Sequence, residues 1–125
     1  METPKLADTA LYFNTRDEFI KVKLDRVAYF EADSNYCNVV FINGAHATIL
    51  TSLTNIEKLL SEKFKTEASI FIRIGKKYII NSRLVFQINV MKQKLVLSDF
   101  VAPNVMELNI SKEALKNLKS LYTNK

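Results

Sequence analysis

The side chains able to perform acid–base or nucleophilic chemistry are few and lie apart in the sequence. His46 is the only histidine and Cys37 the only cysteine, so they complete neither a nucleophile–base pair nor a zinc site. Glu31 and Asp33 have strand spacing and share a face, but no binding cleft accompanies them. We therefore predict no catalytic residue, no metal, no cofactor and no enzymatic activity. Cys37 is expected to be a small buried apolar side chain, and His46 to be structural.

A long stretch without acidic residues indicates a different chemistry, the binding of a polyanion. Between Ala68 and Ser98 there are six lysines and arginines and no acidic residue. Residues 68–125 carry 10 basic and 3 acidic residues, a net charge of +7, whereas residues 1–67 carry 8 and 10, a net charge of −2. Each neutralised phosphate releases condensed counterions, so this asymmetry favours a nucleic acid. A solvated basic surface is the alternative.

Composition describes one ordinary globular domain. The chain has 125 residues, 48% of them hydrophobic and 25% charged. Gly44 and Gly75 are the only glycines, so a glycine-rich phosphate-binding loop is not available. No stretch suits a membrane span, and the first residues lack the features of a signal peptide. With a single cysteine, a cytoplasmic location without membrane contact is expected.

The elements that position the basic residues are mostly strands. Runs rich in Val, Ile, Phe and Tyr alternate with turn signals. The predicted strands are Ala10 to Asn14, Glu18 to Leu24, Val27 to Glu31, Tyr36 to Ile42, His46 to Thr51, Phe71 to Ile74, Tyr78 to Ile80, Leu84 to Val90, Lys94 to Leu97 and Val105 to Leu108. The strongest turn signal, Asn43-Gly44, predicts a type I′ hairpin with positive φ at both residues.

Two segments have helical periodicity instead. A helix is predicted from about Ser52 to Lys63, with Thr54 and Glu57 spaced as a capping box. A terminal helix is predicted from two sets of residues. Its apolar stripe is Leu115, Leu118, Leu121 and Tyr122, and its basic face is Lys112, Lys116 and Lys119.

A basic loop stands between two strand-like pieces in FIRIGKKYIIN, from Phe71 to Asn81. This segment resembles the central signature of LytTR domains, in which a phenylalanine or leucine, an arginine and a polar loop precede an aromatic residue and a valine or isoleucine followed by asparagine. Three more segments resemble the family's opening strand and loop, its small helix, and its closing strand and helix start: VAYFEADSNYCNVVF, TSLTNIEKLL and ELNISKEALKNL. The four landmarks keep the family's order over about Glu18 to Tyr122.

The resemblance implies a fold and a function. The fold is mainly β, an elongated stack of small antiparallel sheets with one helix in mid-chain and one at the C-terminus. Residues 1–17 are a leader or linker that can carry an edge strand, and residues 18–125 are the DNA-binding domain. The implied function is sequence-specific binding of duplex DNA as the output domain of a bacterial transcriptional regulator, such as a response regulator in two-component signalling. Loops enter major grooves, and the DNA bends.

The resemblance also assigns residues to this interface. The three loops are Asp33 to Tyr36, Gly75 to Lys77 and Ser111-Lys112. Base contacts are assigned to Asn35, Lys76 and Lys112, and phosphate contacts to Arg73, Lys77, Tyr78 and Lys116. Many members carry histidine near the position of Gly75 and arginine near that of Lys112, so their base preferences are not transferred.

Two assignments have purely structural alternatives. Asn81 is expected to satisfy backbone groups and not to contact DNA. The strand residue Arg73 has the alternative of an ion pair with Glu31 or Glu107.

The expected partners are duplex DNA with repeated half-sites, a second copy of the chain on that DNA, and RNA polymerase. Two other functions stay open at this point. One is a non-catalytic protein-interaction module of a signalling pathway. The other is an RNA-binding β domain that stacks unpaired bases, which is disfavoured because the basic stretch contains only Tyr78 and Phe86 as exposed-aromatic candidates.

Overall fold

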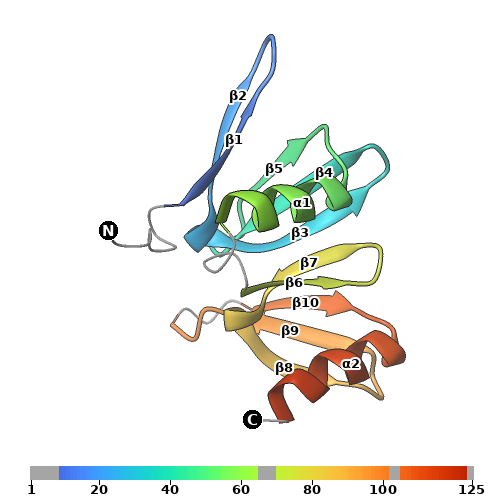
Figure 1. Cartoon of the computed structure of the whole chain (residues 1–125). Coiled ribbons are helices and arrows are strands. Elements are labelled where there is room, and N and C mark those ends of the chain that lie inside the picture. Colours follow the sequence, from blue (N-terminus) through green and yellow to red (C-terminus); the bar gives the residue numbers. More distant parts are fainter. Residues whose placement is uncertain (1–8, 65–69, 102–104, 124–125) are drawn as a thin grey trace. The chain divides into compact units, whose positions relative to one another are not determined.

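Strands dominate this computed structural model, which describes residues 9–64, 70–101 and 105–123 (Figure 1). Ten strands in the described ranges form three antiparallel sheets, and two helices accompany them. The predicted mainly-β fold with one helix in mid-chain and one near the end is confirmed, and each predicted strand occurs with its ends within two residues. The chain divides into unit 1, residues 1–81, and unit 2, residues 82–125. In the described ranges, neither helix is long and apolar enough to cross a bilayer.

Unit 1 is built on a five-stranded sheet with helix α1 (Leu53–Phe64) against one face. In spatial order the strands are β5 (His46–Ile49), β4 (Tyr36–Phe41), β3 (Val27–Asp33), β7 (Tyr78–Asn81) and β6 (Phe71–Ile74). The core contains Phe30, Val39 and Ile79 from the sheet and Ile56 from the helix, all at most 1% exposed. Burial of this one sheet face explains why apolar residues alternate along β3 and β4.

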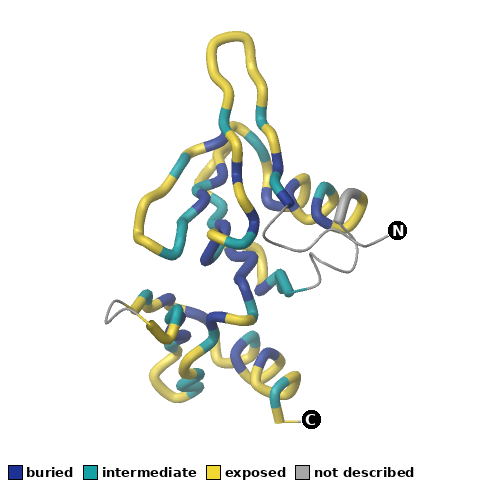
Figure 2. The backbone as a smooth tube through the Cα atoms, turned by 90° about the vertical axis from the view of Figure 1, so that its left-hand side faces the viewer, coloured by how far each residue is buried: buried dark blue, intermediate teal, exposed yellow. Residues whose placement is uncertain are grey.

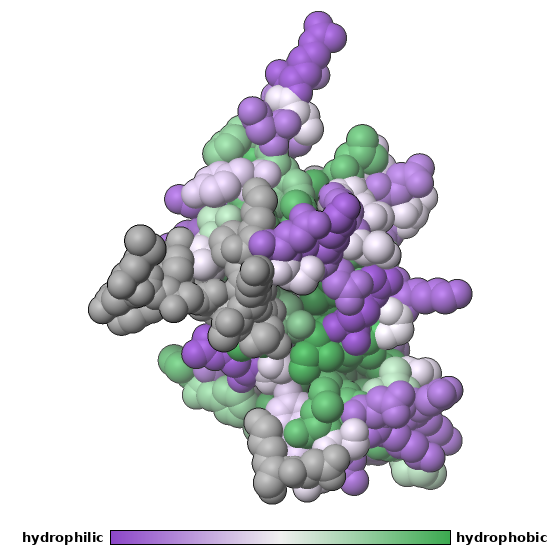
Figure 3. Space-filling model, in the orientation of Figure 1, coloured by the Kyte–Doolittle hydropathy of each residue, from purple (hydrophilic) through white to green (hydrophobic). Residues whose placement is uncertain are grey.

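A two-stranded hairpin extends from this core (Figures 1 and 2). It consists of β1 (Ala10–Asn14) and β2 (Phe19–Lys23), and β1 lies in the segment predicted as a leader with room for an edge strand. At its base Leu11 and Val22 pair with each other and are buried in the core of unit 1. Its far end is exposed and hydrophilic, as the top of Figure 3 shows. The hairpin is therefore anchored at one end only.

The turn at Asn43-Gly44 differs from the predicted type I′ hairpin. Gly44 has a φ of 91°, but Asn43 is not among the residues with positive φ, and Phe41 and His46 are separated by a four-residue connection. The Asn43 side-chain oxygen accepts a hydrogen bond from the Ala45 backbone N–H (2.9 Å). This local bond stabilises a longer turn, so the type I′ prediction is wrong.

The start of α1 also differs from the prediction. Ser52 is the capping residue, because its hydroxyl accepts a hydrogen bond from the Asn55 backbone N–H (3.0 Å). Thr54 and Glu57 lie within the helix and do not form the predicted capping box. A capping box requires its serine or threonine immediately before the helix, a position that Ser52 occupies.

Unit 2 is a three-stranded sheet with helix α2 (Lys112–Thr123). In spatial order the strands are β10 (Val105–Asn109), β9 (Lys94–Ser98) and β8 (Val85–Asn89). Leu115 and Leu118 of α2 are buried, and the Tyr122 hydroxyl donates a hydrogen bond to the Ser82 carbonyl (2.8 Å). Leu121 is 51% exposed, so the buried stripe is shorter than predicted.

Candidate nucleic-acid interface

Two of the three predicted loops lie side by side at one end of the five-stranded sheet (Figure 1). Strands β3 and β7 are antiparallel neighbours, so the end of β3 lies beside the start of β7. The Ala32 backbone N–H donates to the Lys77 carbonyl (2.8 Å), which extends the pairing to the loops. Asp33 and Tyr36 frame the first loop, and Ile74 and Tyr78 frame the second. Two loops that are about forty residues apart in sequence thus lie next to each other at the same end of the sheet.

Lys76 and Asn35 are available side chains of these two loops. Both are exposed, and within the described ranges neither side chain forms a hydrogen bond or an ion pair. Tight backbone turns present them: Gly75 has a φ of 61° at the start of its loop, and Ser34 a φ of 58° before Asn35. Polar groups held outward in this way can donate to an external acceptor without first breaking an internal contact.

Lys77 has the same charge as Lys76 but different surroundings. Its Nζ lies 3.7 Å from a carboxylate oxygen of Glu31 and 5.5 Å from the centre of the Tyr78 ring. Its side chain is nevertheless 62% exposed. Lys77 is therefore drawn toward the sheet by a weak, solvent-screened pair and still faces solvent.

Tyr78 is more deeply placed than a phosphate contact requires. Its residue surface is only 7% exposed, and its ring meets Tyr29 edge-on at 5.8 Å. Burial, and after it the nearby charge of Glu31, raise the pKa of the Tyr78 hydroxyl above its ordinary value of 10.0. The raised pKa makes the hydroxyl, which is protonated at neutral pH in any case, still harder to ionise beside the carboxylate of Glu31.

Arg73 lies on the sheet face that α1 covers. Its Nε donates to the Gly75 carbonyl (2.9 Å), and its Nη1 lies 3.2 Å from the Glu57 carboxylate and 3.5 Å from the Thr54 hydroxyl. Its side chain is 24% exposed. The structural alternative of an ion pair is confirmed, but the predicted partners are wrong.

The two carboxylates predicted for Arg73 bind lysines instead. Glu31 pairs with Lys77, and Glu107 pairs with Lys94 at 3.2 Å. No local sequence pattern distinguishes these pairings, because they depend on the strand register and on where α1 lies. Glu57 was the residue that sequence reasoning missed, since it was assigned to the helix cap.

The third predicted loop belongs to unit 2. The Ser111 hydroxyl caps α2 by accepting a hydrogen bond from the Ala114 backbone N–H (3.3 Å), and Lys112 is the first helical residue. Lys112 and Lys116 are both exposed. A lysine in the first turn is disfavoured by the helix dipole, so Lys112 is there at some cost in helix stability.

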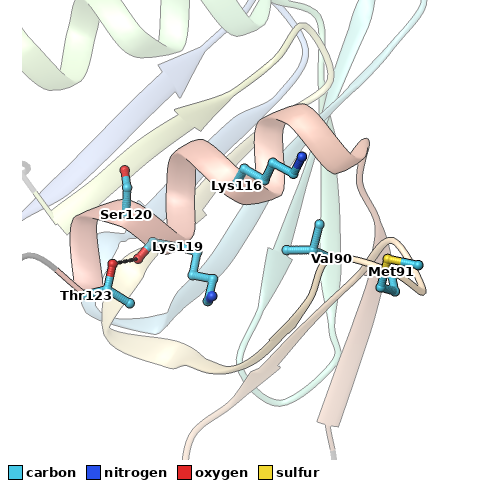
Figure 4. Close-up of a pocket in the computed structure, with 6 residues that line it drawn as sticks. All are labelled: Val90, Met91, Lys116, Lys119, Ser120 and Thr123. Carbon is cyan, nitrogen blue, oxygen red and sulfur yellow. Dashed lines mark hydrogen bonds between the residues drawn. The ribbon is translucent and has the colours of Figure 1, made fainter.

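Lys116 also borders a shallow hollow in unit 2 of about 370 Å³ (Figure 4). Its lining residues are Val90, Met91, Lys116, Lys119, Ser120 and Thr123. Figure 4 shows the lysines along α2 and the two apolar residues across from them, on the turn between β8 and β9. The hollow therefore combines an apolar wall with a basic wall.

Two of the residues predicted to be structural, Cys37 and Asn81, are buried. Cys37 is fully buried, and burial raises the pKa of its thiol to about 11, so the expectation of a small buried side chain is confirmed. Asn81 is 3% exposed, and its side-chain amide donates a hydrogen bond to the Val27 carbonyl (3.0 Å), which confirms that it satisfies a backbone group. His46 is exposed at the start of β5.

Comparison with known proteins gives the class and then the family. A sequence model described as the LytTr DNA-binding domain matches residues 17–123. The protein is therefore a DNA-binding domain associated with transcription regulation, a class that is not catalytic, in agreement with the prediction that it is not an enzyme. Within that class, the chain belongs to the LytTR family.

A solved structure has the same fold. It is the LytTr DNA-binding domain of a Bacillus cereus protein described as a methyl-accepting/DNA response regulator, with a TM-score of 0.64 and 22% sequence identity. The alignment covers 92% of this chain and 97% of that one. A search among curated proteins found no match.

Proposed function

We propose that this chain binds duplex DNA sequence-specifically, as the cytoplasmic output domain of a bacterial transcriptional regulator. In this proposal its loops read major grooves and the DNA bends around them. The observation that carries it is the position of Asn35 and Lys76 on adjacent loops at one end of the sheet. Both side chains are exposed and polar, and neither forms a hydrogen bond or an ion pair within the described ranges. Family membership supports DNA as the polyanion.

Base reading is assigned to Asn35, Lys76 and Lys112. Lysine can donate to guanine O6 and N7, and asparagine can bond adenine N6 and N7 at once, so these residue types suit major-groove edges. All three are exposed. A phosphate of the DNA near the start of α2 would offset the unfavourable interaction between the Lys112 charge and the helix dipole.

Phosphate contacts are assigned to Lys77 and Lys116. Lys77 lies beside the base-reading residue of its loop, and Lys116 lies one helical turn after Lys112. Arg73 and Tyr78, to which the family resemblance assigned phosphate contacts, are not proposed as phosphate contacts. The guanidinium of Arg73 already has three partners, and the Tyr78 ring is buried next to a carboxylate.

Two copies are proposed to bind repeated half-sites and to act by occupying or bending a promoter. Bending stores deformation energy that depends on the sequence between the contacts, which gives specificity at positions that no side chain touches. A contact with RNA polymerase would convert this occupancy into regulation.

Selection from a pool of random duplexes tests the proposal. We expect enrichment of a motif with repeated half-sites, and a gel-mobility shift that depends on the position of the site within the duplex, as bending requires. Absence of enrichment at low salt would favour a protein partner, and preferential capture of single-stranded RNA in a parallel selection would favour an RNA-binding domain.

A further inference from the structure

We propose that Arg73 is a positioning residue, which together with Glu57 of α1 fixes the conformation of the Gly75-Lys76-Lys77 loop. It contacts no DNA. This inference rests on the proposed function, because it explains how Lys76 is held for base reading. It assigns Arg73 a role different from the phosphate contact that the sequence suggested, and it gives Glu57 a role in DNA recognition.

The contacts of Arg73 connect the loop to the helix. On one side its Nε donates to the Gly75 carbonyl at 2.9 Å. On the other side its Nη1 donates to the Glu57 carboxylate at 3.2 Å and lies 3.5 Å from the Thr54 hydroxyl. A rigid, planar guanidinium held at both ends transmits the position of α1 to the loop.

The bond to Gly75 acts directly on Lys76. The Gly75 carbonyl belongs to the peptide group that joins Gly75 to Lys76, and this group is planar. When Arg73 fixes the carbonyl, it also fixes the plane from which the Lys76 backbone continues. Gly75 has a φ of 61°, and no atom of the described residues lies within 4 Å of the place that a Cβ would occupy, so no neighbouring atom on that side helps to fix this plane.

The chain offers a matched control on the other face of the sheet. Glu31 pairs with Lys77 at 3.7 Å, and Glu57 pairs with Arg73 at 3.2 Å, so each carboxylate neutralises one cation at the same loop. The two ion pairs lie on opposite faces of the sheet. Arg73 is opposite Ile79 and Glu31 is opposite Tyr78, and the adjacent residues Tyr78 and Ile79 of β7 point to opposite faces. Lys77 makes no bond from its side chain to the loop backbone in the described structure.

The test compares Glu57→Gln, Glu31→Gln and Arg73→Lys. Simple electrostatics predicts that both glutamate variants bind every duplex more tightly, because each loses one negative charge beside a cation. Positioning predicts a split. Glu31→Gln should bind the selected site and a scrambled duplex slightly more tightly, whereas Glu57→Gln should lose about 10-fold at the selected site only, within the factor of about 5 to 150 that one base contact is worth. Arg73→Lys should show the same selective loss although its charge is retained.

Backbone NMR relaxation of the free protein supplies a second measurement, independent of DNA. Glu57→Gln and Arg73→Lys should lower the order parameters of the Gly75, Lys76 and Lys77 amides, because the Gly75 carbonyl is then held less firmly. Glu57→Gln should do so with little change in melting temperature, because Glu57 is half exposed and contributes little to global stability. Glu31→Gln should leave these order parameters unchanged.

Two results would overturn the inference. Tighter binding of Glu57→Gln to both duplexes would mean that the freed Arg73 reaches phosphate. Unchanged order parameters of the loop amides in Glu57→Gln and Arg73→Lys would mean that the contacts do not hold the loop. If the unaltered protein did not discriminate the selected from the scrambled duplex, the proposed function would fail, while the NMR measurement would still decide the role of Arg73.

Discussion

Lys76 and Lys77 show how neighbouring residues of equal charge acquire different roles. Lys77 lies near Glu31 and over the Tyr78 ring, whereas the Lys76 side chain makes no such contact in the described structure. The sequence suggested the difference only through the family resemblance. The contacts give a physical reason for the two roles. The Lys76 ammonium forms no hydrogen bond or ion pair among the described residues and can bond a base edge, whereas the charge of Lys77 is partly neutralised by Glu31.

Replacing each lysine separately should reveal this difference. We expect Lys76→Ala to lose about 1 to 3 kcal/mol on the selected site and to relax its preference at one or two base positions. Lys77→Ala should weaken all duplexes nearly equally. The measurement is the affinity of both variants for the selected and scrambled duplexes at one salt concentration. Equal losses on both duplexes from both variants would show that Lys76 is only a phosphate contact.

Cys37 is expected to make stability depend on pH in the alkaline range. Burial raises its pKa from the ordinary value of 9.0 to about 11, so between these values the unfolded chain ionises the thiol and the folded protein does not. The folded state then holds the extra proton, and the free energy of unfolding falls as pH rises, by at most about 3 kcal/mol.

Urea unfolding of the unaltered protein and of Cys37→Ala at several pH values measures this effect. The stability difference between the two should shrink in the alkaline range, while the tyrosines that also titrate there cancel in the comparison. Parallel pH profiles would mean that the thiol ionises equally well in the folded protein.

At the scale of elements, residue composition and periodicity predicted all ten strands and both α-helices of the described ranges. These follow from local residue types: alternating apolar residues form β3 and β4, and apolar residues three or four apart form α1. The turn at Asn43 and the cap at Ser52 were mispredicted because two local hydrogen-bonding patterns are possible at each site, and the residue types alone do not show which one forms. The contact of Arg73 with Glu57 was not predictable, because it depends on the register of β6 and on the placement of α1.

Helix α2 allows a stability test of its own. Leu118 is 3% exposed and Leu121 is 51% exposed, although both belong to the predicted apolar stripe. Leu118→Ala should cost about 2 to 5 kcal/mol by removing buried apolar contacts, and Leu121→Ala less than about 1 kcal/mol. Chemical unfolding of both variants measures the difference. Similar small losses would indicate that α2 is not packed on its sheet in solution.

At the scale of the whole molecule, charge is unevenly distributed between the units. Unit 2 has 7 basic and 3 acidic residues, a net charge of +4, whereas unit 1 has 11 and 10, a net charge of +1. Several cations of the basic stretch are already paired: Arg73 with Glu57, Lys77 with Glu31, and Lys94 with Glu107. The composition alone could not show these ion pairs. Of the three paired cations, only Lys77, whose side chain is still 62% exposed, remains in the proposed interface.

Salt dependence of DNA binding tests this electrostatic picture for the whole chain. If roughly 6 to 8 phosphates are neutralised, the logarithm of the binding constant should fall with the logarithm of salt concentration at a slope of about −5 to −7. Lys116→Ala should make the slope shallower by about 0.9, the share of one phosphate, whereas Lys58→Ala, an exposed lysine of α1 outside the proposed set, should leave it unchanged. A slope shallower than about −2 would contradict a phosphate-rich interface and would favour a protein partner, since protein interfaces rely less on counterion release. Equal effects of the two variants would mean that net charge, and not the arrangement of the loops and α2, determines binding.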